Sequence, residues 1–436
     1  MSLNFPSTAR DSGYSASWRK RVRNMQRGMP ALDPLVAALS LDFTRGSLDP
    51  RVTFTRPDAT SCATRFNAQG LLQVLAPNSP RFDYDPATLQ PSGLLIEESR
   101  TNLFIDSRDM TTASWSKTDV TPTRNQVGID GVANTACLMT EGVAGTSDLN
   151  QGLAGLPAGA TVTSSRYLKR GNNDWIRLAV ASSGGNGWQA WLNLATGALG
   201  TSGALGAGAG SASVQNVGNG WYRLTITATI GGADTDCNNN IYATSANSVT
   251  ARVNNATYIM DAAQLEVGAF ATSFILTGAS TATRAADSAL MTGANFSSWY
   301  NQSRGALFAE ASTFATTSAR GVLSVNDGTS NNKFDIRFRS SSTLGTIAGS
   351  GIWAIGPVIS DAKMHKIALS ISANSQLVAA DGLAPSAAAA ATLPAVTQLQ
   401  IGGLDGGASQ QLNGYIRRIA YFDTQLAPDQ IVAFTK

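Results

Sequence analysis

The chain has 436 residues, more than one hydrophobic core usually serves, so two or three domains are expected. Only 14% of the residues are charged and the formal net charge is +3, which argues against nucleic acid as a general partner. No apolar run reaches the ~20 residues that cross a bilayer, so no membrane insertion is expected. The 42 glycines, among many small polar residues, predict an all-β fold of short strands and many turns.

The first predicted region, residues 1–40, is an attachment arm. It contains a basic run that ends before a glycine and a proline: Trp18, Arg19, Lys20, Arg21 and Arg23. Such a run predicts a short amphipathic helix or an extended arm. It is either a solvated charged segment or an arm that docks on an acidic surface of another subunit, since basic arms order on contact with a partner.

Residues 41–105 predict a small β-rich region that anchors the chain. Apolar residues alternate with threonines over 52–55, Pro86 breaks the chain, and Leu94 begins another apolar run. These are the signals of short strands and tight turns.

Residues 106–287 predict a β-sandwich of the jelly-roll type. Leu224, Ile226 and Ala228 alternate with threonines, as in a strand with one buried and one wet face. Turn signals recur at the density of such a sandwich. The stretch Gly200–Gly210 holds five glycines and predicts a flexible loop.

Residues 288–436 predict a second sandwich. Along 333–339 apolar and charged residues alternate, so Phe334, Ile336 and Phe338 are expected to be buried and the charged side chains to face solvent. Two sandwiches behind an N-terminal attachment region are therefore the expected architecture.

Three stretches carry a resemblance to a known family. The order of motifs over 41–104, and the later motifs NGWYR (219–223) and AQLE (263–266), resemble head spike and tail fibre proteins of tailed bacteriophages and their carbohydrate-binding modules. The strand over 412–423, followed by a short helix over 426–434, looks like the end of a concanavalin-like or laminin-G-like sandwich. Ala427 stands where that family has a serine at the helix cap.

The resemblance implies a noncatalytic virion structural protein, a head spike, head fibre or tail fibre, that binds host surface glycans. Its partners would be other virion proteins, and phage fibres imply a homotrimer. The N-terminus lacks a signal peptide, so synthesis in the host cytoplasm and a final location in the virion are expected. Two alternatives stay open: a capsid decoration protein without receptor binding, and a polysaccharide depolymerase.

The sequence contains few candidates for catalytic residues. The single histidine, His365, lies in a strand pattern and is expected to be a surface residue, and no nucleophile, P-loop or zinc motif is present. Two carboxylates would suffice for a glycosidase. The candidate pairs are Glu97 with Glu98, Asp234 with Asp236, and Glu310 with Asp335, and no spacing brings any pair together. No enzyme activity and no cofactor are therefore expected.

Sugar binding needs an aromatic face with polar groups beside it. The alternation over 187–194 places Trp188 and Trp191 on opposite faces of a strand. Trp191 shares its face with Gln189 and Asn193, which predicts that these three residues bind carbohydrate. The alternative is that a neighbouring subunit or domain covers Trp191.

Two smaller predictions concern metals and cysteines. Asp234 and Asp236 lie in a loop rich in oxygen ligands, a weak candidate for calcium against the reading as a solvated turn. The three cysteines, Cys62, Cys137 and Cys237, have no metal or redox spacing and are expected to be reduced and structural.

Overall fold

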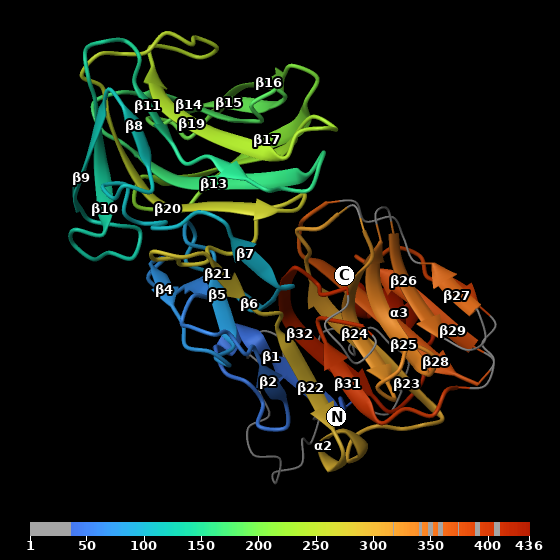
Figure 1. Ribbon diagram of the computed structural model, residues 1–436. Helices are drawn as coiled ribbons and strands as arrows, with labels where there is room; N and C mark the ends of the chain where they lie inside the picture. The colour runs from blue at the N-terminus through green and yellow to red at the C-terminus, as the bar shows by residue number, and fades with distance from the viewer. Residues whose placement is uncertain are drawn as a thin grey trace.

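The computed structural model describes residues 36–436 except 317, 340–341, 348–351, 356–360, 374, 389–392 and 405–409. The predicted attachment residues lie outside this part of the chain: Trp18, Arg19, Lys20, Arg21 and Arg23. The regular secondary structure of the described chain is nearly all strand, arranged in antiparallel sheets that form sandwiches (Figure 1). The predicted all-β class with two sandwiches is confirmed. Among the described residues no helix is long and apolar enough to span a membrane.

The first sandwich is the jelly roll, in the upper part of Figure 1. One sheet has the order β17-β18-β13-β20-β10-β9. Its strands are β9 (Val120–Gln126), β10 (Ala136–Glu141), β13 (Thr161–Arg170), β17 (Ala209–Asn216), β18 (Trp221–Thr229) and β20 (Thr257–Val267). The other sheet has the order β16-β15-β14-β19-β11-β8, with β12 (Leu153–Ala154) also on β19. Its strands are β8 (Ser116–Thr118), β11 (Asp148–Asn150), β14 (Trp175–Ala181), β15 (Gly187–Asn193), β16 (Leu199–Leu205) and β19 (Asp236–Thr244).

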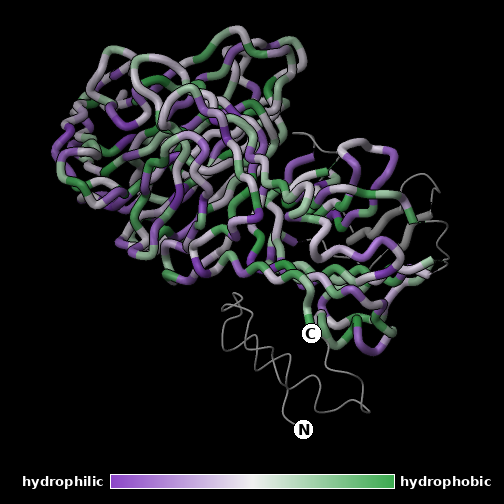
Figure 2. Tube along the Cα trace, turned by 90° about the horizontal axis from the view of Figure 1, so that it is seen from below, coloured by the Kyte–Doolittle hydropathy of each residue, from purple (hydrophilic) through white to green (hydrophobic). Residues whose placement is uncertain are grey.

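Period-two alternation builds the core between these sheets. In β18, Leu224, Ile226 and Ala228 are fully buried, and the threonines between them face outward, as predicted. Figure 2 shows the same principle along many strands, where hydrophobic and hydrophilic residues follow one another. The hydrophobic side chains on the two inner faces form one continuous cluster.

The predicted flexible loop at Gly200–Gly210 is wrong. Residues 199–205 form β16 on β15, and residues 209–216 form β17 on β18. Ladder hydrogen bonds come from the backbone, so glycines and small side chains do not prevent pairing. The turn between the strands uses Gly206, whose φ of 56° suits a residue without a Cβ.

The second sandwich pairs an eight-stranded sheet with a seven-stranded one. The first has the order β30-β29-β28-β23-β32-β6-β5, with β1 also on β32. Its strands are β1 (Leu39–Asp42), β5 (Arg81–Tyr84), β6 (Pro91–Ile96), β23 (Arg304–Ala311), β28 (His365–Ser372), β29 (Ser375–Ala380), β30 (Ser386–Ala388) and β32 (Gly414–Phe422). The second runs β2-β22-β31-β24-β25-β26-β27. Its strands are β2 (Thr53–Thr55), β22 (Ser288–Thr292), β24 (Arg320–Asn326), β25 (Lys333–Arg339), β26 (Ser342–Ile347), β27 (Ile352–Ile355) and β31 (Gln398–Ile401).

The segment expected as a small separate region, 41–105, shares sheets with this second sandwich. β1 and β6 both pair with β32, and β2 pairs with β22. Two short ribbons complete the junction between the sandwiches: β3 (Thr64–Phe66) with β4 (Leu72–Val74), and β7 (Arg100–Asn102) with β21 (Ala282–Arg284). The N-terminal strands, blue in Figure 1, therefore lie where the two sandwiches meet.

One strand of the second sandwich departs from the simple alternation. Phe334, Ile336 and Phe338 are buried in β25, as predicted. Asp335 and Arg337, expected in solvent, are also buried, and they form an ion pair. Mutual pairing is what allows these charges to leave water.

The helix predicted over 426–434 is present at the C-terminal end of the described chain. The C-terminal helix α3 (Pro428–Thr435) packs on the outer face of the eight-stranded sheet, and η1 (Phe43–Arg45) and α2 (Ala294–Ser297) are single turns. Ala427 supplies no capping side chain. Instead the Ala427 amide donates to Gln430 Oε1 at 2.8 Å, which satisfies one of the free groups at this helix start.

Candidate functional site: a cavity where the two sandwiches meet

A buried ion network holds the junction together. Three arginines and three carboxylates form it, so its formal charges cancel, and all six side chains are fully buried: Arg56, Asp58, Arg81, Glu97, Arg284 and Asp287. Arg81 lies at its centre and contacts both Glu97, at 2.5 Å, and Asp287. Arg284 contacts the same Glu97 oxygen at 3.1 Å. This network joins segments that lie far apart in the sequence.

Glu97 is fixed as a carboxylate in this network. Burial opposes its ionisation, but the guanidiniums of Arg284 and Arg81 outweigh burial and hold its pKa at about 2. The amide and the hydroxyl of Ser273 also donate to it, each at 2.7 Å. Glu97 therefore cannot act as a general acid near neutral pH.

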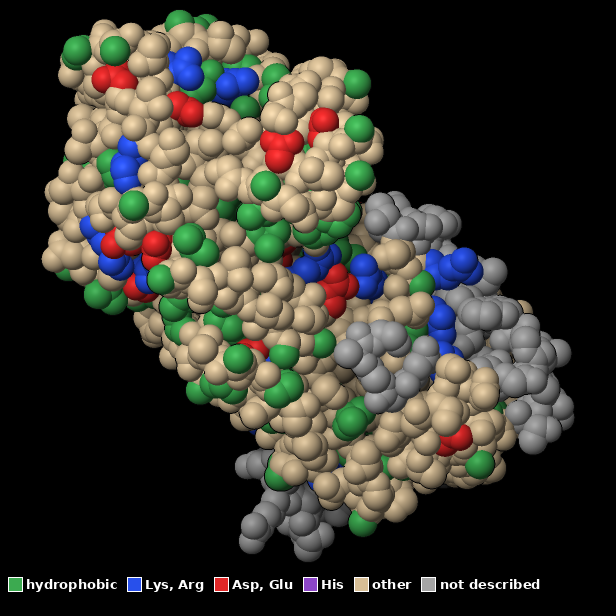
Figure 3. Space-filling model, viewed as in Figure 1, with side chains coloured by type: hydrophobic (Ala, Val, Ile, Leu, Met, Phe, Trp, Pro, Cys, Tyr) green, Lys and Arg blue, Asp and Glu red, His purple; other side chains and the backbone are tan. Residues whose placement is uncertain are grey.

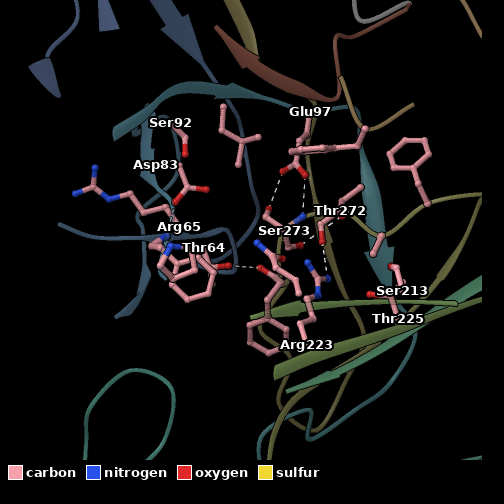
Figure 4. A pocket seen from close by; sticks show the side chains of 18 of the residues that line it. Thr64, Arg65, Asp83, Ser92, Glu97, Ser213, Arg223, Thr225, Thr272 and Ser273 are labelled. Carbon is pink, nitrogen blue, oxygen red and sulfur yellow. Dashed lines mark hydrogen bonds between the residues drawn. The ribbon is translucent and has the colours of Figure 1, made fainter. Parts of the chain in front are cut away.

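Beside the network lies a cavity of about 380 Å³, called the junction cavity (Figure 4). Its walls come from β3, β5, β17, β18 and the segment 269–274, and two aromatic residues of the second sandwich complete it, Phe314 and Tyr415. A volume in this range is typical of small-molecule sites, and sites at domain junctions are common.

One wall carries polar side chains that the protein itself does not use. On β17 and β18, the side chains of Ser211, Ser213, Gln215 and Thr225 form no hydrogen bond with any described residue. Ser213 and Thr225 lie next to each other in Figure 4. Side chains of this kind, facing a cavity, can bind the hydroxyls of a ligand.

Aromatic side chains form another part of the cavity wall. Phe270 is half-buried, with the guanidiniums of Arg100 and Arg320 at 4.9 and 5.8 Å from its ring centre. Phe314 packs edge-on against Tyr415, with ring centres 5.3 Å apart. The cavity thus combines apolar ring surface with uncommitted hydroxyls.

Two arginines of the cavity are held by neutral groups. Arg223 donates from Nη2 to Ser165 Oγ at 2.9 Å and to Thr272 O at 2.7 Å. Arg65 donates to Gln73 Oε1 and to Phe82 O. Neither arginine has a carboxylate within ion-pair distance among the described residues. The cavity therefore contains two guanidiniums without a carboxylate partner, along with the carboxyl groups of Asp83 and Asp85.

Asp83 is a buried carboxyl group in the wall of the cavity. It accepts hydrogen bonds from the amides of Phe66 and Tyr84, at 2.6 and 2.9 Å, and from the hydroxyl of Tyr415 at 2.9 Å. Burial outweighs these bonds and raises the pKa of Asp83 to about 6. The carboxyl exchanges its proton near neutral pH.

Asp83 gives the protein a stability that depends on pH. Its pKa in the folded state lies above the ordinary value of 3.8, so below pH 6 the folded state holds a proton that the unfolded state has released. The contribution of Asp83 to the free energy of unfolding is therefore expected to rise as the pH falls from 6 to 4.5, by on the order of 2 kcal/mol. Urea denaturation of the natural chain and of Asp83→Asn at both pH values measures it. An equal rise in the variant would contradict the role of Asp83.

The predicted sugar-binding residues lie away from this cavity, on the outer face of β14, β15 and β19. Trp188 and Trp191 lie on opposite faces of β15, as predicted, and only Trp188 packs against the core cluster. The free ring face expected of Trp191 is absent, because that side chain is only 2% exposed. Its Nε1 donates to Val249 O at 2.8 Å, so a loop of the same chain covers it. Carbohydrate binding by Trp191, Gln189 and Asn193 stays a prediction.

His365 is not the surface residue that the sequence predicted. It is 9% exposed, and its ring nitrogens lie 2.7 Å from Asp381 Oδ2 and 2.9 Å from Asp361 Oδ1. Asp361 lies just before β28, and Asp381 directly follows β29, the next strand of the hairpin. Strand alternation alone does not reveal these contacts. The three cysteines are free and buried, as expected.

The candidate calcium residues support a turn. Asp234 accepts from Ser182 and Asn186, and Asp236 accepts from the amide and hydroxyl of Ser183. Among the described residues, no cluster of three or more potential metal-ligating side chains occurs. Calcium binding by Asp234 and Asp236 stays a prediction.

Charged side chains are sparse on the face drawn in Figure 3, where red and blue groups are scattered over a largely neutral surface. Of the junction residues, only Glu97 was considered from the sequence, as a candidate catalytic carboxylate paired with Glu98, and the ion network was not predicted. The sequence gives one indication of this network, the position of Glu97. This acidic residue directly follows the apolar run that ends β6, and a side chain at that position is carried into the core by the buried strand.

No protein-family model matches the chain, and no curated protein does. Among solved structures it is similar to the CBM40 domain of the Ruminococcus gnavus IT-sialidase bound to α2,3-sialyllactose, at 16% identity and a TM-score of 0.29, over 32% of this chain and 86% of that one. It is similar to the NanB sialidase of Streptococcus pneumoniae at 13% identity and 0.27, over 30% and 24%. For the leech intramolecular trans-sialidase the values are 13% and 0.28, over 33% and 24%. TM-scores this low carry no argument about function.

Proposed function

We propose that the protein is a noncatalytic structural component of a tailed-phage virion, a spike or fibre, that binds host surface glycans in the junction cavity. The observation that carries the glycan part is the wall of uncommitted polar side chains, Ser211, Ser213, Gln215 and Thr225, in a cavity that also exposes aromatic rings. Sugars need both, because their hydroxyls seek polar partners and their C–H faces pack on rings. The virion part rests on the sequence motifs that resemble phage spikes and fibres.

A single cavity of this kind binds weakly, and a homotrimer would compensate by avidity. Repeated sites on one particle raise the effective concentration of the second and third contacts. Incorporation into the virion, which is assembled in the host cytoplasm, would present many copies of the site on one particle. A capsid decoration protein is the alternative without receptor binding, and it predicts no glycan affinity at all.

The binding proposal is tested with the double variant Ser213→Ala plus Thr225→Val, which removes two free hydroxyls and almost no volume. Each lost hydrogen bond is worth about 1 kcal/mol, so affinity on an array of bacterial surface oligosaccharides is expected to fall by about tenfold or more. Thr229→Val is the matched control, on the same strand and face but outside the cavity. Equal binding by the double variant and the control would contradict the cavity as the site.

One observation favours a second candidate, a polysaccharide depolymerase. The pKa of Asp83, about 6, is in the range of a general acid. A glycosidase also needs a second carboxylate. Glu97 is held in the ion network, and Asp85 caps a turn through the amides of Ala87 and Thr88. Release of reducing ends from host polysaccharide, lost in Asp83→Asn, would establish the enzyme instead.

A further inference from the structure

The outer face of the seven-stranded jelly-roll sheet carries a prearranged stack of aromatic and guanidinium groups. Arg177 of β14 lies between Trp191 of β15 and Tyr242 of β19, with its Cζ 5.5 and 5.3 Å from the two ring centres. Its Nη1 donates to the Tyr242 hydroxyl at 2.8 Å, and Nε and Nη2 donate to Gln189 Oε1 at 2.9 and 2.6 Å. All three strands are neighbours in one sheet, so the stack is rigid.

A loop of the same chain covers this stack. Residues 245–251, named the cover loop, connect Thr244 and Arg252, which face each other as an isolated β-bridge. Val249 O of the cover loop accepts from Trp191 Nε1, and Asn247 Oδ1 accepts from the Thr201 amide at 2.7 Å. Trp191 is only 2% exposed in consequence, and Tyr242, over whose ring the Arg252 guanidinium lies at 4.0 Å, is 3% exposed.

Little else holds the cover loop in place. Its residues are small or polar, five of the seven are exposed, and none belongs to a hydrophobic core cluster. Ser248 adopts a φ of 63°, a left-handed conformation that is unfavourable for a residue with a Cβ. Segments with few buried apolar contacts open at low free-energy cost. The loop is therefore held closed by its bonds to Trp191 and Thr201 and by a bond at its base, from Thr244 Oγ1 to Ala246 O at 3.2 Å, while Ser248 carries backbone strain.

We propose that this face is a second glycan-binding site, at which a hexopyranose stacks on Trp191 when the cover loop moves away. The freed indole supplies the flat face that a sugar ring requires. Gln189 and Asn193 share this face, and because their oxygens already accept from Arg177 and from the amides that follow Asn193, their amide N–H groups are the ones left to bind sugar oxygens. The indole N–H also exchanges Val249 O for a sugar oxygen. This site lies outside the junction cavity and does not depend on binding there.

The test replaces residues 245–251 by Asn-Gly, which closes a tight hairpin between Thr244 and Arg252. An apparent Kd for hexopyranose oligosaccharides on the same array is expected to improve about tenfold, because the site no longer has to open first. Adding Trp191→Ala must abolish this gain. The fluorescence of Trp191 is obtained as the difference between the chains with and without this residue. Stronger quenching of that difference by acrylamide shows that the ring is uncovered.

The outcomes separate this site from the junction cavity. A gain that persists when Ser213→Ala and Thr225→Val are added assigns it to the Trp191 face, whereas a gain lost in that background overturns the second site and leaves the cavity in place. If the shortened loop prevents folding, Asn247→Ala, which removes only the anchor to Thr201, must still raise quenching and binding. Uncovered Trp191 without any gain in glycan binding overturns the proposal.

Discussion

Replacing Arg81 by methionine is expected to lower the free energy of unfolding by about 3 to 5 kcal/mol. The substitution keeps most of the side-chain volume but leaves Glu97 and Asp287 buried without the guanidinium between them. A carboxylate that loses its partner keeps the full cost of its removal from water. Guanidinium chloride denaturation at pH 7, followed by tryptophan fluorescence, measures the change.

The matched control for this prediction is Arg51→Met. Arg51 also pairs with an aspartate, Asp49 at 2.9 Å, but the two side chains are 33% and 23% exposed. A pair that water reaches contributes at most about 1 kcal/mol. The double variant Arg81→Met plus Glu97→Gln should lose less stability than the sum of the two single variants. In each single variant one buried charge is left without its partner, and the second substitution removes that charge. Equal effects of Arg81→Met and Arg51→Met would show that the network does not stabilise the junction.

The ion network and the junction cavity share residues. Ser273 donates to Glu97 from inside the network and also lines the cavity, as Figure 4 shows. Thr272, its neighbour, accepts from Arg223 on the jelly-roll sheet. The part of the cavity wall at Thr272 and Ser273 is thus fixed by charged groups behind it, which limits the entropy lost when a ligand binds against it.

Alternation of side chains was enough to predict both sandwiches and several of their strands. It works for Leu224, Ile226 and Ala228 because a half-buried strand must sort its side chains by polarity. The C-terminal helix was equally readable from Pro428 and the apolar residues after it. Where most side chains are small, as in β16 and β17, apolar and polar residues do not alternate clearly, and these strands were missed.

The junction could not be predicted, because it depends on contacts over long sequence distances. Arg81 and Asp287 are 206 residues apart, and β1 at the start of the described chain pairs with β32 near its end. Nothing local in the sequence encodes such pairings. The cover on Trp191 has the same origin: the polar neighbours Gln189 and Asn193 correctly indicated the outer face, but the residue that reaches the ring, Val249, lies far along the chain.

Replacing Arg166 by methionine is expected to have the opposite effect and to stabilise the protein, by about 1 to 4 kcal/mol. Arg166 is fully buried in the jelly-roll core, where its Cζ lies 4.3 Å from the Phe104 ring centre. No carboxylate pairs with it among the described residues, and its Nε and Nη2 have no hydrogen-bond partner there. Methionine fills similar space without a charge to desolvate.

The pH dependence gives this prediction an independent check. Burial lowers the pKa of Arg166 to about 9, below its ordinary value of 12.5, so above pH 9 the folded state releases a proton that the unfolded state keeps. The natural chain should therefore gain stability between pH 8 and pH 10 relative to Arg166→Met, and the advantage of the variant should shrink. Arg170→Met, at an exposed arginine on the same strand, controls for loss of charge alone. Destabilisation by Arg166→Met with no such convergence at high pH would mean that the guanidinium stabilises the core after all.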